Sequence, residues 1–132
     1  MTATAVPDQH QRDRIATDLG CTLFVEAGAG SGKTTALVDR VVRLVDAGTE
    51  LRSIAAITFT EKAGAELRDR LRTELEKRAA AETADPERAE RLRVAADQID
   101  AAAIGTLHSF AQRVLTENPV EAGLPPRVEV LD

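Results

Sequence analysis

The chain has 132 residues, of which 43% are hydrophobic and 30% charged, and its formal net charge is −5. These values predict one globular domain with a mainly aliphatic core, because only three residues are aromatic. The negative net charge argues against a protein that wraps nucleic acid with a large positively charged surface. No apolar run is long enough to span a membrane. The single Cys21 excludes an internal disulfide and, with an N-terminus unlike a signal peptide, predicts a cytoplasmic location.

The N-terminal part predicts a polar lead-in, a short helix and a first strand. Residues 1–8 form the lead-in, and a helix over residues 9–19 is expected to end at Gly20. The amide of Gln11 offers one donor and one acceptor, which match the N6 and N7 edge of adenine; a solvated surface glutamine is the alternative. Residues 21–26, which contain the apolar run Leu23-Phe24-Val25, predict the first strand, with Cys21 buried at its start.

A glycine-rich stretch follows, with the sequence Ala27-Gly28-Ala29-Gly30-Ser31-Gly32-Lys33-Thr34-Thr35. A strand before it and a helical pattern over residues 36–47 are the context of a phosphate-binding P-loop. Glycines let backbone N–H groups point at a phosphate, and the helix adds its positive end. Lys33 is then expected to contact the β- and γ-phosphates of a nucleoside triphosphate and to act in catalysis, and Thr34 to hold Mg²⁺. The generic pattern starts with Gly where this chain has Ala27, and the alternative is a Gly/Ala-rich loop with an incidental lysine.

The rest of the chain alternates helical and strand patterns, which predicts an α/β fold with a parallel sheet. A helix with a wide apolar face is expected to end at Gly48, and a strand over residues 54–60, buried on both faces, to follow it. A charged helix over residues 61–81 has one narrow apolar stripe, made of Ala63, Leu67, Leu71 and Leu75. Asp85-Pro86 predicts the start of another helix, whose apolar face comprises Ala89, Leu92, Ala96 and Ile99. A short strand over residues 101–105 precedes a helix that ends near Asn118-Pro119.

Four blocks, in this order, resemble the N-terminal ATP-binding part of UvrD/Rep/RecB-type superfamily 1 DNA helicases. Gln11-Arg12 resembles the Q motif, which reads adenine, and residues 27–34 fit the P-loop form of that family, with alanine first. Residues 57–67 resemble motif Ia, which contacts single-stranded DNA, and residues 105–110 resemble the next DNA-contacting block. The resemblance implies an incomplete RecA-like P-loop domain that uses ATP and Mg²⁺. Glu61 and Leu67 favour the RecB/AddA-like branch.

The same resemblance implies a set of DNA-binding residues: Thr58, Phe59, Thr60, Lys62, Thr106, His108 and Ser109. A phenylalanine at a strand end offers a ring on which a base can stack, and hydroxyl groups can donate to phosphate without reading sequence. The alternatives are a core side chain for Phe59 and a structural histidine for His108.

Two features that the family needs for ATP hydrolysis are not found in these 132 residues. No Asp-Glu pair follows a predicted strand, and the family also needs an arginine from a second RecA-like domain. The segment that ends in Val128-Glu129-Val130-Leu131-Asp132 resembles instead the approach to an inserted subdomain.

We therefore expect residues 9–118 to be a partial ATP-binding domain and residues 119–132 an extended tail toward a missing subdomain. The expected parent is an ATP-dependent helicase that translocates on single-stranded DNA in repair or recombination. Its expected partners are its own C-terminal helicase domains and other subunits of a recombination complex, and the isolated chain is expected to bind ATP without efficient hydrolysis. A nucleotide-binding module without turnover and a small P-loop kinase are the alternatives.

Overall fold

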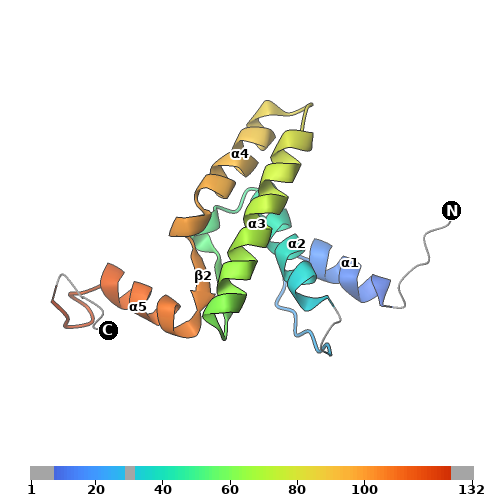
Figure 1. Ribbon diagram of the computed structural model, residues 1–132. Helices are drawn as coiled ribbons and strands as arrows, with labels where there is room; N and C mark the ends of the chain where they lie inside the picture. Colours follow the sequence, from blue (N-terminus) through green and yellow to red (C-terminus); the bar gives the residue numbers. More distant parts are fainter. Residues whose placement is uncertain (1–7, 29–31, 126–132) are drawn as a thin grey trace.

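The computed structural model describes residues 8–28 and 32–125, and it has the mixed α/β architecture that the sequence predicts (Figure 1). Its elements, in chain order, are α1 (Gln9–Thr17), α2 (Lys33–Asp46), the 3₁₀ turn η1 (Leu51–Ser53), β1 (Ala55–Thr58), α3 (Glu61–Ala81), α4 (Pro86–Asp97), the 3₁₀ turn η2 (Ile99–Ala101), β2 (Ala103–Thr106) and α5 (Leu107–Glu117). Helices α2, α3 and α4 form the body, and α1 and α5 lie on opposite sides of it (Figure 1).

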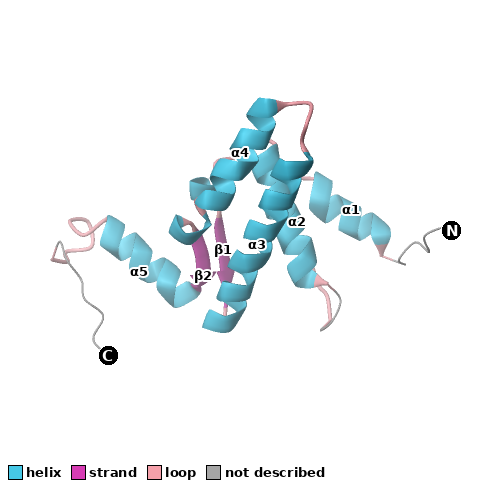
Figure 2. Ribbon diagram, turned by 45° about the horizontal axis from the view of Figure 1, so that its top comes forward, coloured by secondary structure: helices cyan, strands magenta, loops and turns pink. Residues whose placement is uncertain are grey.

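Strands β1 and β2 pair in parallel, and the chain passes from one to the other through α3 and α4 (Figure 2). The register places Ala55 opposite Ala103 and Thr58 opposite Thr106. Because the strands are parallel, both end at the same edge of the sheet, where α3 and α5 begin. This arrangement is consistent with a partial RecA-like domain.

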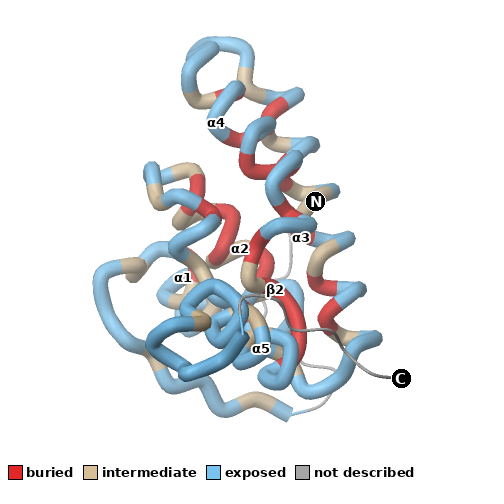
Figure 3. The backbone as a smooth tube through the Cα atoms, turned by 90° about the vertical axis from the view of Figure 1, so that its left-hand side faces the viewer, coloured by how far each residue is buried: buried red, intermediate tan, exposed pale blue. Residues whose placement is uncertain are grey.

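The core lies where α2, α3 and α4 pack against one another and against the strands, and Figure 3 shows the buried residues gathered there. Apolar residues that recur every three or four positions give each helix one buried face. The most deeply buried side chains come from all three helices and the two 3₁₀ turns, and they are Val42, Val45, Leu51, Leu67, Leu71, Leu75, Leu92 and Ile99. Helix α5, in contrast, has no buried residue.

The predicted helix starts at α3 and α4 are confirmed by their caps. The Thr60 hydroxyl oxygen accepts a hydrogen bond from the Ala63 N–H at 3.1 Å, and the Asp85 carboxylate accepts one from the Arg88 N–H at 3.1 Å. Such caps satisfy amide groups that have no partner inside the helix. Gly48 follows α2 with φ of 106°, in the left-handed region that favours glycine.

The predicted first strand is wrong for this structure. Residues 21–26 join neither β1 nor β2 and have no regular structure, and Cys21 is exposed. A strand needs a neighbour for its backbone hydrogen bonds, and the described residues place no neighbour beside this segment. The prediction that this second strand is buried on both faces is also wrong, because Ala56 of β1 is buried whereas Ala55 and Ile57 are exposed.

Smaller differences concern the ends of elements. Helix α1 ends at Thr17 rather than at residue 19, β1 covers Ala55–Thr58 rather than residues 54–60, and β2 begins at Ala103 rather than at residue 101. Residues 1–7 of the predicted lead-in and the extended piece at Val128-Glu129-Val130-Leu131 lie outside the described residues. Within the described ranges, no helix is both long and apolar enough to cross a membrane.

Candidate functional site

The start of α2 carries four of the phosphate-loop residues that the structure describes, and the other two, Ala27 and Gly28, lie in the segment before it. Gly32 has φ of 84°, and a Cβ there would lie 3.0 Å from Nη1 of Arg12, so both the backbone conformation and the close approach favour glycine. Lys33, Thr34 and Thr35 follow in the first turn of α2 and are exposed. The N–H groups of a first turn have no partner within the helix, so they can bind an anion. Ala29, Gly30 and Ser31 of the predicted loop lie outside the described residues.

A cavity of about 660 Å³ lies between α1, residues 21–27 and the start of α2. Gln11 lines it from α1 and Lys33 lines it from α2, together with Ala27 and Gly32. The structure thus brings together two predicted residues that are 22 positions apart in the sequence. The volume lies in the range of small-molecule pockets, which is roughly 300–1,000 Å³.

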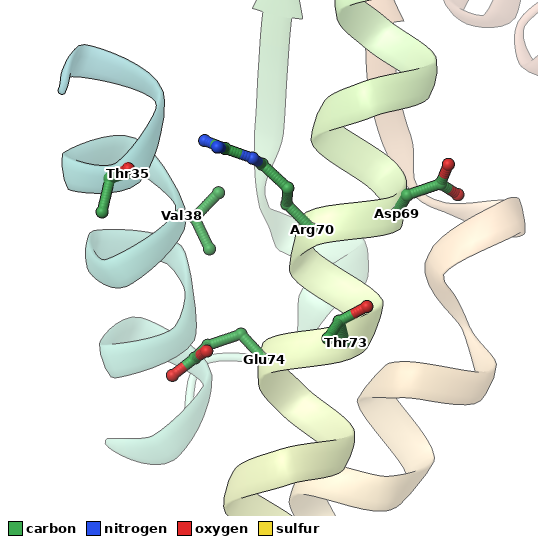
Figure 4. Close-up of a pocket in the computed structure, with 6 residues that line it drawn as sticks. All are labelled: Thr35, Val38, Asp69, Arg70, Thr73 and Glu74. Carbon is green, nitrogen blue, oxygen red and sulfur yellow. The ribbon is translucent and has the colours of Figure 1, made fainter.

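A smaller hollow of about 330 Å³ lies between α2 and α3 (Figure 4). Thr35 is the only predicted nucleotide-binding residue among those that line it. Figure 4 shows Arg70 and Glu74 extending from α3 toward α2, while Asp69 points away. Arg70 and Glu74 form ion pairs along α3, with Glu66 and Arg78 respectively. The larger cavity is therefore the better candidate for a nucleotide site.

Two arginines at the larger cavity are not among the predicted site residues. Nε of Arg12 donates to Oδ1 of Asp8 at 2.9 Å, and this hydrogen bond lowers the pKa of the Asp8 carboxyl group. Arg40 donates to three backbone carbonyl groups between Ile15 and Cys21. The position of Arg12 next to Gln11 is a signal that could have found it. Arg40 has no such signal, because its acceptors become neighbours only when α1 packs on α2.

The second group of predicted residues lies at the edge where β1 and β2 end. Phe59 follows β1 and is 99% exposed, so the alternative of a core side chain is wrong. Lys62 in the first turn of α3 and His108 in the first turn of α5 are also exposed. In Figures 1 and 2, α2 and α3 both begin on the lower side of the molecule, and α5 begins beside the start of α3.

The hydroxyl groups at this edge have partners within the chain. Thr60 caps α3, and Thr58 donates to the carbonyl oxygens of Thr60 and Gly105 at 3.2 and 3.3 Å. Thr106 is only 5% exposed, and its hydroxyl oxygen accepts from the Ser109 N–H at 3.1 Å while donating to Oε1 of Glu61 at 3.2 Å. The contacts of Thr60 and Thr106 order the starts of α3 and α5, a role that the sequence motifs do not predict for them.

Glycines bring those two helix starts close together. A Cβ on Gly64 would lie 3.1 Å from the Cα of Gly105, and one on Gly105 would lie 2.9 Å from Oγ of Ser109. Nη1 of Arg68 also donates to the Ile104 carbonyl oxygen at 2.7 Å, which fixes α3 on β2. The end of β1 and the first turns of α3 and α5 therefore lie together, and their exposed residues Phe59, Lys62 and His108 define what is called the exposed edge here.

The described residues contain no cluster of three or more His, Cys, Asp and Glu side chains that could hold a metal ion. Thr34, exposed next to Lys33, is the hydroxyl-bearing candidate for a metal ligand, and it is not itself among the residues that line the larger cavity. A cation there would be held mainly through the phosphate groups of a bound nucleotide, as Mg²⁺ commonly is.

Comparisons with known proteins match nearly the whole chain. A family model described as the UvrD/REP helicase N-terminal domain matches residues 8–132. The chain is 39% identical over 123 residues to DNA helicase II of Haemophilus influenzae, an alignment that covers 92% of this chain and 15% of that protein.

Two relatives of another kind match to a similar degree. An ATP-dependent helicase/nuclease subunit of Lactobacillus acidophilus is 32% identical over 114 residues, which are 86% of this chain and 9% of that protein. The exonuclease/helicase subunit RexA of Lactococcus lactis subsp. cremoris is 39% identical over 112 residues, which are 85% of this chain and 9% of that protein. The chain thus spans between 9% and 15% of the length of these relatives. The predicted preference for the RecB/AddA-like branch stays a prediction, because both kinds of relative reach 39% identity.

Proposed function

Because the chain belongs to the UvrD/REP helicase N-terminal domain family, we propose that it is the ATP-binding N-terminal part of an ATP-dependent DNA helicase. The parent protein would translocate along single-stranded DNA and unwind duplexes in repair or recombination. The names of the relatives, a DNA helicase and subunits of helicase/nucleases, support this proposal. The observation that carries it is the cavity that has Gln11 on α1 and Lys33 at the start of α2 among its walls.

In this proposal each wall of the cavity binds one part of ATP. The Gln11 amide pairs with the N6 and N7 edge of adenine, and the Lys33 ammonium contacts the β- and γ-phosphates. The first-turn N–H groups of α2 bind phosphate oxygens, assisted by the positive end of the helix dipole. Thr34 is the residue that would hold Mg²⁺, which neutralises phosphate charge during transfer. Within these 132 residues no Asp-Glu pair follows a strand, so efficient hydrolysis would depend on other parts of the parent.

The exposed edge made of Phe59, Lys62 and His108 would bind the DNA strand. Phe59 offers a fully exposed ring for stacking, and Lys62 offers a positive charge for a phosphate group. The hydroxyls of Thr58, Thr60, Thr106 and Ser109 already have partners within the chain, so we assign them mainly to ordering the first turns of α3 and α5.

Titration of labelled ATP against the wild type and Lys33→Ala tests the nucleotide site. Removal of the ammonium group should weaken binding by about 2 kcal/mol, or roughly 30-fold, because a charge-assisted phosphate contact is lost. Lys77→Ala is a matched control, because Lys77 is exposed on α3 and is absent from the cavity walls. Equal ATP affinities for the wild type and Lys33→Ala would contradict the assignment.

The parent protein gives a second test, which separates a helicase from a P-loop kinase. Single-stranded DNA should stimulate ATP hydrolysis by the parent helicase, whereas a kinase would need a phosphoryl acceptor instead. ATP hydrolysis that does not respond to DNA would favour the alternative of a different P-loop enzyme.

A further inference from the structure

Arg40 connects the helix that carries Lys33 to the helix that carries Gln11. Its Nη1 donates to the carbonyl oxygens of Ile15 at 2.6 Å and Asp18 at 3.1 Å, and its Nη2 donates to that of Cys21 at 3.2 Å. One guanidinium group therefore binds the last turn of α1 and the turn that follows it. The planar fork of an arginine is suited to several acceptors at once, which a lysine is not.

The acceptors need such a donor because of how α1 ends. The N–H of Leu19 bonds to the Thr17 carbonyl oxygen at 3.1 Å and so does not reach the Ile15 carbonyl oxygen, as it would in a longer helix. The last carbonyl groups of a helix lack partners within it, and a positive charge there also interacts favourably with the helix dipole. Arg40 thus replaces the hydrogen bond that the Ile15 carbonyl group would receive in a longer helix, and it also binds two carbonyl groups beyond the end of α1.

The position of Arg40 relates these contacts to the nucleotide site. Arg40 lies seven residues after Lys33 on α2, which is about 10 Å along the helix axis. Gln11 lies four residues before Ile15 on α1, so the two share a face of that helix. Gln11, Ile15, Lys33 and Arg40 all line the cavity of about 660 Å³.

We propose that Arg40 is a positioning residue, which holds α1 at a fixed place on α2 and thereby sets the distance between Gln11 and Lys33. Adenine and the phosphates can be bound at the same time only if that distance matches the nucleotide. This inference rests on the proposed function, namely that the cavity takes ATP. Arg40 acts through backbone groups of α1, so its loss should affect the base end of the site more than the phosphate end.

The test compares three ligands on the 132-residue chain: ATP, GTP and inorganic tripolyphosphate, each with Mg²⁺. Arg40→Met keeps the apolar stem of the side chain and removes the donors. It should weaken ATP binding about tenfold and bring the ATP-over-GTP affinity ratio close to one, while tripolyphosphate binding changes less than about twofold. Arg40→Lys should restore part of the ATP affinity, because the positive charge remains near the end of α1.

Arg43→Met is the matched control, because Arg43 lies on the same helix and pairs with Asp39 at 3.1 Å instead of with α1. It should leave all three affinities unchanged. Gln11→Ala should lower the ATP-over-GTP ratio as Arg40→Met does, and the double variant should be no worse than either single one, because both act on the same contact.

The outcomes separate the two proposals. If the wild type binds no ATP, or if Gln11→Ala leaves the ATP-over-GTP ratio unchanged, the proposed nucleotide site is wrong, and the role of Arg40 with it. If Gln11→Ala lowers that ratio and Arg40→Met does not, only the role of Arg40 is wrong. If Arg40→Met lost ATP and tripolyphosphate binding equally, the role of Arg40 would be a general structural one, and this inference would be overturned. Thermal unfolding of both Arg40 variants below the assay temperature would lead to the same conclusion.

Discussion

At the scale of single residues, Phe59 combines a large apolar ring with almost complete exposure, at 99%. Phe59→Ala should therefore change the free energy of unfolding by less than about 0.5 kcal/mol, as is usual for surface substitutions. It should weaken single-strand binding by the parent protein by about 1–3 kcal/mol, with little base preference, because a stacking platform is lost. A melting curve and a DNA titration on the same variant measure the two effects.

The chain offers a control for that substitution. Phe24 is 94% exposed but lies in the segment between α1 and α2, and so belongs neither to β1 and β2 nor to the first turns of α3 and α5. Phe24→Ala should leave DNA affinity unchanged. A large fall in melting temperature for Phe59→Ala, with DNA affinity unchanged in the folded protein, would remove Phe59 from the DNA-binding surface.

Asp46 is the residue from which a pH dependence can be derived. Nε and Nη2 of Arg88 donate to its two carboxylate oxygens, each at 2.5 Å, and these hydrogen bonds lower the pKa of Asp46. A carboxyl group with a lowered pKa stabilises the fold above its ordinary pKa, which is about 4, and this contribution is lost as the pH falls through the lowered value.

The prediction is that Asp46→Asn lowers the melting temperature at pH 7, and that the difference from the wild type shrinks as the pH falls below about 4. Asp100→Asn is the control, because Asp100 is 82% exposed and its pair with Arg72 should contribute little. Melting curves of the three proteins between pH 7 and pH 2 measure the effect. A difference that stayed constant over that range would show that charge is not its cause.

At the scale of elements, the contact between α3 and β2 depends on two facing glycines. Gly64→Ala removes a residue that disfavours helix, which alone would stabilise α3 by about 1 kcal/mol. The added methyl group, however, would lie 3.1 Å from the Cα of Gly105, which is backbone and cannot rotate away. Because overpacking costs about 1–3 kcal/mol, we expect a net loss of stability on the order of 1 kcal/mol.

Chemical denaturation of Gly64→Ala measures that loss. Gly20→Ala is the control, because a Cβ there would meet nothing within 4 Å, and its stability should stay within about 0.5 kcal/mol of the wild type. If Gly64→Ala proved more stable than the wild type, α3 would not be held against β2 as closely as described.

The elements also show which features can be predicted from the sequence. The starts of helices α3 and α4 agree with the prediction, because the caps Thr60 and Asp85 and the apolar stripes are local in sequence. The strand predicted over residues 21–26 depends on a neighbouring strand, and an apolar run does not specify where its neighbour lies. The three contacts of Arg40 likewise depend on the packing of α1 on α2.

At the scale of the whole molecule, the nucleotide cavity and the exposed edge are built from separate elements. We expect the 132-residue chain to bind ATP but to turn it over at well below about 1 s⁻¹, with or without single-stranded DNA. The reason is that no Asp-Glu pair follows a strand and no second domain supplies an arginine, which contributes roughly 10³–10⁵ in other nucleotide hydrolases. Phosphate release by the purified chain measures this rate. A rate of about 1 s⁻¹ or more that disappears in Lys33→Ala would reveal a catalytic group within the chain.

The parallel pairing of Thr58 with Thr106 also sets an order of assembly. Helices α3 and α4 connect the two strands, so pairing of the strands closes a long loop. Closing that loop has an entropic cost, which the local contacts of the folded α3 and α4 must offset before the strands can pair. The antiparallel contact of α3 with α4 is local and needs no sheet, so this hairpin should form early and the strand pair late. Amide protons of β1 and β2 should then exchange faster than those of the buried turns of α3, and the edge that presents Phe59 would be among the last features of the folded chain to appear.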